Sequence, residues 1–232
     1  MLMSEARLSM ALDHPNVVKV LEVDRKKGVD YLVMEWVDGR DLSAILKRCR
    51  ALKRKLPASF AVHVIRQVLA ALAHAHECTG DDGRLLGVVH CDVGPSNVFV
   101  SRTGDIKLGD FGVARGLRKD KYGGPIAGKT HYLSPEVLEG DVTLEADLWA
   151  TAVTLYELLT LERPFEGATD AEVHQAIRVG EWTPLRQRRP DVPEAVEAIV
   201  AREFAHDRKA RVAHAAQFAD ALKATGLGAE QS

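Results

Sequence analysis

The sequence predicts an α+β fold, in which a small strand-containing head is followed by a mainly helical body. Two patterns predict this order: short β-branched runs lie within residues 17–36, and apolar residues recur at helical spacing from Pro135 onward. Composition favours a packed domain, because 46% of the 232 residues are hydrophobic and charges of both signs are mixed throughout. We therefore expect one large domain, or two lobes that share a core.

The head is predicted to contain a helix and two strands. Residues 1–13 carry apolar side chains at helical spacing, and this pattern stops before His14-Pro15. Two β-branched runs follow, at Val17–Val23 and Val29–Trp36, and the Lys26-Lys27-Gly28 segment between them is typical of a turn. The sequence therefore predicts a hairpin after the first helix.

The body is predicted to begin with two helices and a hairpin. One helix is expected from Asp41 to Arg50, after the Asp38-Gly39 turn, and a longer one from Pro57 to Glu77. Short strands follow at Val98–Ser101 and Ile106–Leu108. The helical pattern after Pro135 is interrupted at later prolines, around Pro164, Pro184 and Pro190–Pro193.

Composition also argues against several classes of function. The formal net charge of −2 gives no overall basic field for nucleic acid or for an anionic membrane. The apolar stretch Leu148–Leu161 contains Glu157 and is too short to span a bilayer, so it predicts a buried helix. No charged-then-apolar leader opens the chain, which predicts a cytoplasmic protein.

Cysteine and histidine spacing does not predict a metal site. The three cysteines are expected to be free thiols: Cys49, Cys78 and Cys91. No Cys-x-x-Cys or His-x-x-x-His spacing supports a zinc site among the histidines that might suggest one: His63, His74, His76 and His90. We interpret these histidines as residues of a helix surface, except His90, which is expected to be buried.

Three short motifs predict the chemistry. They are His90-Cys91-Asp92-Val93-Gly94-Pro95-Ser96-Asn97, then Asp110-Phe111-Gly112, then Ser134-Pro135-Glu136. Phosphoryl transfer needs a carboxylate that orients the attacking hydroxyl, and oxygen ligands that hold Mg²⁺ against the β- and γ-phosphates. Asp92 and Asn97 on one loop, with Asp110 after the next hairpin, supply both kinds of group. The hairpin strands are expected to bring Asn97 and Asp110 together.

On these motifs, in this order and spacing, the sequence resembles the protein kinase family, and specifically its bacterial serine/threonine branch. The resemblance extends over essentially the whole chain. It implies a bilobal fold with a truncated small lobe, made of one helix and two strands, and a mainly helical large lobe. It also implies ATP and Mg²⁺ as cofactors and a protein substrate as partner. By this resemblance Asp92 is the catalytic carboxylate, and Asn97 and Asp110 are Mg²⁺ ligands.

The resemblance assigns further residues to nucleotide binding and to bracing. The residues implied in the ATP site are Met34 at the gatekeeper position, Glu35 and Val37 in the adenine-binding hinge, Asp41 at the ribose, Phe99 beneath adenine, and Asp110. The residues implied in bracing are Glu5 in the first helix, Asp147 under the catalytic loop, and Arg211 paired with Glu136. Without the resemblance, Trp36 and Phe99 would be interpreted as core aromatics.

The sequence departs from the family at its start. The strands that carry the glycine-rich phosphate loop and the partner lysine of Glu5 are expected before that residue, and residues 1–4 do not contain them. Without them the phosphates lose covering amides and a cation, so transfer by this chain is expected to be impaired. The implied domains are residues 1–37 as a partial small lobe with the hinge, 38–225 as the large lobe, and 226–232 as a tail.

The catalytic loop departs from the family as well. Cys91 stands where the family has an arginine, and Gly94 where it has a lysine. The first change removes the docking charge for a phosphorylated activation loop, whose variable centre offers only Tyr122 for phosphorylation. We hypothesise that Lys129 provides the ammonium lost at Gly94 and is thereby catalytic beside Asp92 and Asn97. The alternative is a solvent-facing lysine.

The leading interpretation is a protein serine/threonine kinase that transfers the γ-phosphate of Mg-ATP to a protein hydroxyl. Serine or threonine is preferred because the catalytic loop lacks the alanine and arginine typical of tyrosine kinases. The alternative is a pseudokinase, a binding or regulatory module without phosphoryl transfer. A small-molecule phosphotransferase is a weaker third interpretation, because the Pro-Glu element and the helix after it resemble protein kinases.

Overall fold

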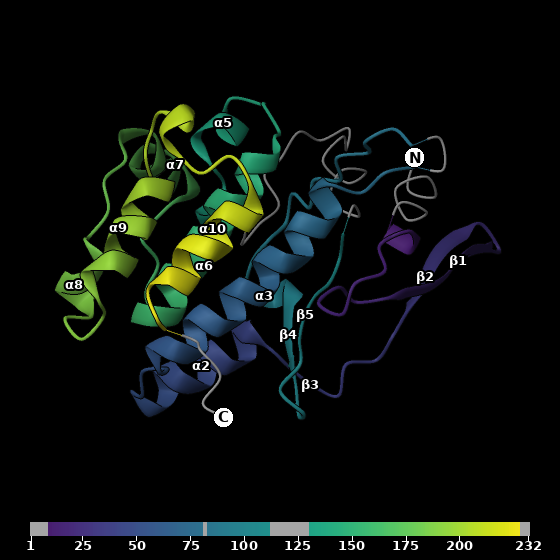
Figure 1. The fold of residues 1–232 in the computed structure, drawn as a ribbon, viewed down its shortest axis with the longest axis horizontal. Coiled ribbons are helices and arrows are strands. Elements are labelled where there is room, and N and C mark those ends of the chain that lie inside the picture. The colour runs from purple at the N-terminus through teal and green to yellow at the C-terminus, as the bar shows by residue number, and fades with distance from the viewer. Residues whose placement is uncertain (1–8, 81–82, 112–129, 228–232) are drawn as a thin grey trace.

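The computed structural model describes residues 9–80, 83–111 and 130–227. Figure 1 shows a strand hairpin on one side of the molecule, the helices on the other, and short strands between them. This order matches the predicted head and helical body. Of the first predicted helix, residues 9–13 are described: Ser9 and Met10 are helical, and residues 11–13 are not.

The head is a two-stranded antiparallel hairpin. Strand β1 (Val20–Lys26) pairs with β2 (Val29–Met34) through a turn at Lys27-Gly28, where the φ angles are +52° and +81°. Two-residue turns with positive φ match the right-handed twist of the strands they join. The first strand begins later than predicted, because Val17 is buried and pairs in parallel with Leu108 instead. This contact attaches the head to the central strands.

Three short strands link the head to the body. Strand β4 (Val98–Ser101) lies between β3 (Gly39–Asp41) and β5 (Ile106–Leu108), and both pairs are antiparallel. The β4–β5 hairpin has the predicted bounds, whereas β3 was expected to be only a turn. A Cβ on Gly39 would lie 1.9 Å from the carbonyl oxygen of Val100, so glycine is what allows β3 to pair.

The helices surround one buried helix, α6 (Leu144–Thr160), in which every residue from Ala146 to Thr160 is buried. Around it lie α2 (Leu42–Leu52), α3 (Ala58–His76), α5 (Pro135–Leu138), α7 (Asp170–Val179), α8 (Leu185–Arg188), α9 (Glu194–Glu203), α10 (Ala215–Ala224), and three 3₁₀ turns, η1 (Pro95–Asn97), η2 (Thr130–Tyr132) and η3 (Arg208–Ala210). Helices α3 and α9 contact α6, and α10 contacts α3. The predicted buried helix at 148–161 is therefore confirmed.

One described helix, α3, is long and apolar enough to cross a membrane by length and composition. From the sequence, the apolar stretch that was compared with a membrane span was residues 148–161 instead. Half of the apolar window in α3 is buried inside the fold, where the helix contacts α6, α10 and β5. Burial in the core of the helical body accounts for the apolar composition of α3.

The predicted pair between Glu136 and Arg211 is present. Arg211 Nη1 donates to the two carboxylate oxygens of Glu136 at 2.9 and 3.0 Å, and the guanidinium carbon lies 4.6 Å from the centre of the Trp149 ring. Both side chains are almost completely buried. Loss of one partner would leave an unpaired buried charge, which costs about 3–5 kcal/mol. The pair therefore fastens α5 to the loop before α10.

Candidate functional site

One buried carboxylate holds the backbone of the loop that carries Asp92. Asp147 of α6 accepts the N–H groups of His90 and Cys91, each at 2.8 Å, with different carboxylate oxygens. Nε2 of His76 lies 2.9 Å from Oδ2 of Asp147. Cys91 has a positive φ of 65°, an uncommon conformation for a residue other than glycine, and it lets two successive N–H groups reach the same side chain. The hydrogen bonds fit the bracing role expected for Asp147, and His76 is a buried part of it instead of a helix-surface residue.

Asp92 and Asn97 are joined directly. The Asn97 amide nitrogen donates to the Asp92 carbonyl oxygen at 2.8 Å and to Oδ2 of its carboxylate at 2.9 Å. These bonds orient the amide so that its oxygen is the atom available to a cation. Asn97 is buried and Asp92 is half-buried, so the Asp92 carboxylate is still within reach of a ligand.

Asp110 is brought to Asn97 through the backbone. The Gly109 N–H donates to the carbonyl oxygen of Asn97 at 2.8 Å, so the β4–β5 hairpin closes as predicted and Asp110 follows directly. Asp110 has a positive φ of 62°. The next carbonyl oxygen, that of Phe111, accepts a hydrogen bond from Ser9 Oγ at 2.5 Å. The turn that carries Asp110 is therefore tied to Asn97 on one side and to the end of the first helix on the other.

His90 lies behind both acidic segments and is fully buried, as expected. Its Nδ1 accepts the Asp92 N–H at 3.2 Å, and its Nε2 lies 2.8 Å from the Gly109 carbonyl oxygen, to which it donates. Burial lowers the pKa of His90 below its ordinary value, against the opposing effect of Asp147. The ring is therefore neutral, and its two nitrogens join the loop of Asp92 to the strand end before Asp110.

A cavity of about 340 Å³ opens between β2, β3 and the turn of Asp110. The residues that the sequence assigned to nucleotide binding all line it: Met34, Glu35, Val37, Asp41, Phe99 and Asp110. Sequence reasoning missed Val18 and Gly109, which also line the cavity. A Cβ on Gly109 would come within 3.0 Å of the Phe99 ring and 3.2 Å of Val18, so a glycine just before Asp110 keeps this wall open. Apolar walls with a few polar groups are typical of a small-molecule site.

The Glu35 carboxylate binds a lysine on β5. Glu35 Oε1 accepts hydrogen bonds from Lys107 Nζ at 2.7 Å and from the Lys19 N–H at 2.8 Å. Burial acts to raise the pKa of Glu35, but these hydrogen bonds outweigh it and hold the pKa below its ordinary value. The Glu35 side chain is thus occupied, and its N–H donates to the Lys19 carbonyl oxygen at 2.9 Å, so the Glu35 backbone group left for a ligand is its carbonyl oxygen. The sequence did not predict Lys107, which joins the hinge to the strand that leads to Asp110.

Two residues at the rim of the cavity differ from the expectation. Asp41 is the N-cap of α2, and its Oδ1 accepts the Ala44 N–H at 2.8 Å. One Asp41 oxygen is therefore used by the helix, and only the other remains for a ribose hydroxyl. Trp36 is 88% exposed, which rules out the alternative interpretation of it as a core aromatic.

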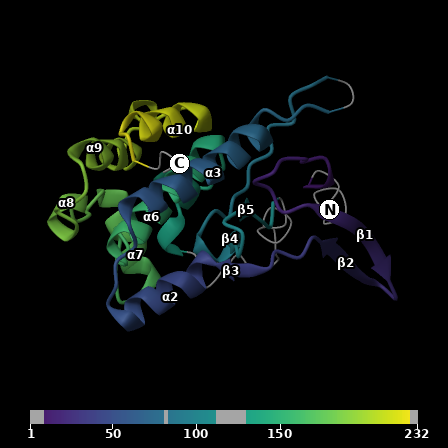
Figure 2. The same ribbon diagram turned by 60° about the horizontal axis from the view of Figure 1, so that its bottom comes forward.

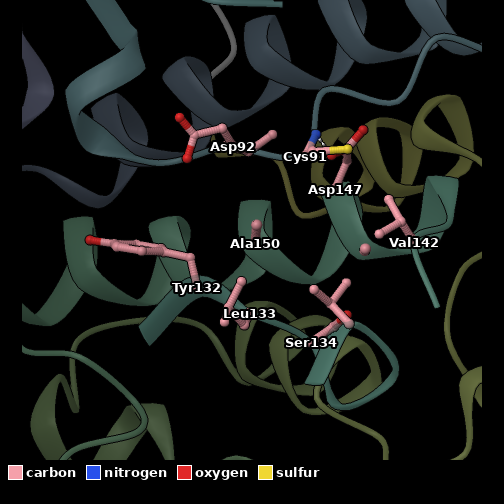
Figure 3. Close-up of a pocket in the computed structure, with 11 residues that line it drawn as sticks. Cys91, Asp92, Tyr132, Leu133, Ser134, Val142, Asp147 and Ala150 are labelled. Carbon is pink, nitrogen blue, oxygen red and sulfur yellow. Dashed lines mark hydrogen bonds between the residues drawn. The ribbon is translucent and has the colours of Figure 1, made fainter. Parts of the chain in front are cut away.

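A second cavity, of about 20 Å³, lies on the other side of the Asp92 loop. Figure 3 shows Cys91 and Asp92 on one wall, facing Tyr132, Leu133 and Ser134. This volume is about that of one water molecule. It is lined by the catalytic loop, by the segment before α5 and by α6, so it marks the place where these three segments meet beside the Asp92 carboxylate.

Some predicted residues lie outside the part of the chain that the structure describes. They are Glu5, Gly112, Tyr122 and Lys129. The catalytic role of Lys129 therefore stays a prediction. Gly94, whose missing ammonium Lys129 was expected to supply, has an extended φ of 174°, and the described atoms nearest to a Cβ there would be those of the Tyr132 ring, at 3.9 Å. The described residues thus leave room for a Cβ at position 94.

The polar groups near Asp110 fit Mg²⁺. Asp110 offers carboxylate oxygens and Asn97 an oriented amide oxygen, and hard oxygen ligands suit Mg²⁺ better than softer metals. The imidazole nearest to these groups, that of His90, uses both nitrogens in hydrogen bonds to the backbone. The donor set therefore matches the cofactor that the motifs predicted.

Comparison with known proteins agrees with the family that the sequence motifs resemble. A family model described as "Protein kinase domain" matches residues 1–223. Tyrosine-protein kinase MasK of Myxococcus xanthus is 37% identical over 226 residues, covering 96% of this chain and 35% of that protein. Serine/threonine-protein kinase PrkC of Bacillus subtilis is 32% identical over 206 residues, covering 88% of this chain and 30% of that protein. The chain thus spans about a third of the length of these relatives.

A solved structure shows the same fold. The kinase domain of Mycobacterium tuberculosis PknI matches with a TM-score of 0.74 and 24% sequence identity, covering 96% of this chain and 76% of that one. The predicted α+β fold, with few strands in the small lobe and a mainly helical large lobe, is therefore confirmed. The division at residues 37 and 225 stays a prediction.

Proposed function

This chain belongs to the protein kinase family, and from that premise we propose that it transfers the γ-phosphate of Mg-ATP to a serine or threonine hydroxyl of a protein. The observation that carries the proposal is the linkage of three groups, Asp92, Asn97 and Asp110, of which Asp110 lines the large cavity and Asp92 the small one. Asn97 donates to the Asp92 carboxylate at 2.9 Å, and its own carbonyl accepts the N–H of Gly109, the residue before Asp110. A structural lobe alone has no chemical need for these three residues in this arrangement.

Each group has a distinct role in the proposed reaction. The hinge backbone at Glu35 and Val37 binds adenine, Phe99 packs beneath it, and the free oxygen of Asp41 binds the ribose. Asn97 and Asp110 hold Mg²⁺, which when bound neutralises charge on the phosphates. Asp92 accepts a hydrogen bond from the substrate hydroxyl and so orients it for attack.

A comparison of two aspartate variants tests the proposal. With radiolabelled Mg-ATP and a mixture of protein substrates, Asp92→Asn is expected to lower transfer by roughly 100-fold or more but to leave nucleotide binding intact. Asp110→Asn is expected to lower both, because the Mg²⁺ ligand is lost. Asp141→Asn is the matched control, since Asp141 is exposed and pairs only with exposed Arg208. A chain that transfers no phosphate, or an Asp92→Asn variant that transfers as well as the parent, refutes the assignment.

The alternative is a pseudokinase that binds partners without phosphoryl transfer. Cys91 and Gly94 favour it, because the cations usual at these positions are absent. Within the described residues, Arg40 is the one basic side chain that lines the large cavity. The two functions separate in the same assay, since a pseudokinase gives no transfer in the parent chain and no difference between Asp92→Asn and Asp141→Asn.

We propose further that Lys129 supplies the ammonium that Gly94 lacks. The space at Gly94 makes a rescue experiment possible, because the described atoms nearest to the Cβ of a residue at that position are those of the Tyr132 ring, at 3.9 Å. Lys129→Ala is expected to lower the transfer rate about tenfold, and the double variant with Gly94→Lys is expected to restore most of it. Unchanged transfer by Lys129→Ala would leave that residue as a solvent-facing lysine.

The acceptor residue has a second candidate, tyrosine, because MasK is named a tyrosine-protein kinase. Serine or threonine is retained because the loop around Asp92 has no tyrosine-kinase pattern and PrkC is named a serine/threonine-protein kinase. Acid hydrolysis of the labelled products distinguishes the two. Phosphotyrosine as the main product would overturn the serine/threonine assignment while leaving the kinase proposal intact.

A further inference from the structure

The chain has a strongly basic segment that its net charge of −2 conceals. Six of the nine residues from Lys47 to Lys55 are lysine or arginine, and no aspartate or glutamate occurs from Leu42 to His76. The segment comprises the second half of α2 and the loop before α3. We call it the basic patch, and it consists of Lys47, Arg48, Arg50, Lys53, Arg54 and Lys55.

The basic patch is on the outside of the helical body. Helix α2 buries Leu42 and Leu46, and all six basic residues are exposed. Figure 2 shows α2 at the outer edge of the molecule, where no other element covers it. The helix ends at Lys53, whose φ of 51° and N–H bonds to the Arg50 and Cys49 carbonyls direct the loop outward. The basic patch is thus exposed at an uncovered edge of the helical body.

Of the six basic side chains, two bind other described parts of the fold. Arg50 binds the buried Glu157 at 2.6 Å and the Leu161 carbonyl, and Lys55 donates to the Arg188 carbonyl at 2.9 Å. Lys47, Arg48, Lys53 and Arg54 have no carboxylate partner in the described parts of the chain. Cations near a helix C-terminus also interact favourably with the helix dipole. That stabilisation falls off within the last turn, so it does not explain why a lysine is present at position 47.

An apolar side chain lies among these charges. Leu52 is 47% exposed between Arg50 and Lys53, and Ala51 beside it is exposed as well. Lysine and arginine around an exposed leucine on a helix are typical of surfaces that bind anionic lipid headgroups. The stretch from Leu42 to Ser59 contains no aromatic residue on which nucleic acid bases could stack, which argues against a single-stranded nucleic acid.

We propose that the basic patch binds the anionic surface of a lipid bilayer, with Leu52 entering the headgroup region. This inference does not depend on the proposed phosphoryl transfer, because it uses neither the nucleotide cavity nor Asp92. It departs from the expectation drawn from net charge, since binding depends on the local electrostatic field and not on the total charge.

Co-sedimentation with vesicles tests the proposal. The chain is expected to bind phosphatidylcholine vesicles that contain about 30% phosphatidylserine, to ignore pure phosphatidylcholine, and to dissociate when salt is raised toward about 1 M. Each cation near an anionic surface is worth about fivefold in partitioning, so Lys53→Gln with Arg54→Gln is expected to lower binding roughly twentyfold. Leu52→Ala is expected to weaken binding without changing its salt dependence.

The hairpin turn of the head provides a matched control. Lys26 and Lys27 are adjacent and exposed, they form no ion pair with a described residue, and Lys27 has the same left-handed φ as Lys53, 52° against 51°. Lys26→Gln with Lys27→Gln removes the same charge and is expected to leave vesicle binding unchanged. Circular dichroism of all variants establishes that the fold is retained.

Three results would overturn the proposal. They are equal binding to neutral and anionic vesicles, equal losses in the patch and hairpin variants, and no binding to either vesicle. A soluble polyanion distinguishes the last case: if polyglutamate or a DNA oligonucleotide binds the parent chain but not the Lys53/Arg54 variant, the patch recognises a soluble partner and the lipid assignment is wrong.

Discussion

The carboxyl group of Glu203 is expected to make folding stability depend on pH near neutrality. Glu203 ends α9 and is fully buried. Its Oε1 accepts the Val212 N–H at 3.3 Å, and its Oε2 has no hydrogen-bond partner within the described residues. Burial raises the pKa of Glu203 from 4.5 to about 7, although the Val212 N–H and the nearby arginines oppose this.

The direction of the effect follows from proton binding. Between about pH 4.5 and 7 the folded chain holds a proton on Glu203 that the unfolded chain has released, so acid favours the folded state. The free energy of unfolding therefore falls as the pH rises through this interval. One pKa unit corresponds to about 1.4 kcal/mol, so the total contribution is about 3 kcal/mol.

Glu203→Gln removes the titration and keeps the shape of the side chain. Any cost of burying the amide is the same at every pH, because glutamine does not titrate. The stability of the variant relative to the parent is therefore expected to increase by about 3 kcal/mol between pH 5 and pH 8. Denaturant unfolding at several pH values in this range measures that difference.

A second glutamate on the same helix serves as the control. Glu194 is exposed at the start of α9, so Glu194→Gln removes the same charge without a buried titration. Its stability relative to the parent is expected to stay constant over the same pH range, within a few tenths of a kcal/mol. If Glu203→Gln gives the same flat profile, Glu203 titrates normally and the reasoning from burial is refuted.

Three further outcomes are expected. Lys107→Met frees the Glu35 carboxylate and is expected to raise the KM for ATP several-fold with little change in kcat. Steady-state kinetics measures both constants, and an unchanged KM would show that the Lys107–Glu35 pair does not position the hinge. Arg211→Leu, which leaves Glu136 buried without a partner, is expected to lower unfolding free energy by about 3–5 kcal/mol in denaturant titrations, and a loss below about 1 kcal/mol would contradict this. In thermal-shift titrations Mg-ATP is expected to raise the melting temperature of this chain by no more than about 2 °C, because Arg40 is the one described cation that lines the large cavity. A larger rise in melting temperature would show that other contacts hold the phosphates.

The features that were predicted correctly from the sequence are those set by residues close to one another along the chain. The β4–β5 hairpin and the long helix α3 follow from local periodicity, and the structure has them within a residue or two of the predicted bounds. The pairing of Asn97 with the turn of Asp110 was also accessible, because a short hairpin must bring its two ends together. Such features require no knowledge of where distant segments lie.

The features that were missed depend on contacts between distant residues. His76 and Asp147 are 71 positions apart, and Lys107 and Glu35 are 72 apart, so no local pattern predicts either contact. Strand β3 was missed because Gly39 was interpreted by its turn propensity, whereas its importance is the absence of a Cβ against Val100. Net charge also did not reveal the basic patch, because it averages that segment with acidic residues elsewhere in the chain.

The position of Cys91 shows why loss of the family's arginine does not imply loss of catalysis. Residue 91 shapes the loop through its backbone: its N–H binds Asp147 at 2.8 Å, and its φ of 65° turns the chain toward Asp92. Any residue other than proline can provide that N–H, and arginine and cysteine differ little in their tolerance of this φ. Cys91 lines the small cavity together with Ser134, and neither Asn97 nor Asp110 lines that cavity. A change from arginine to cysteine therefore alters what the loop can bind at that cavity, while the geometry that joins Asp92 to Asn97 is held by Asp147.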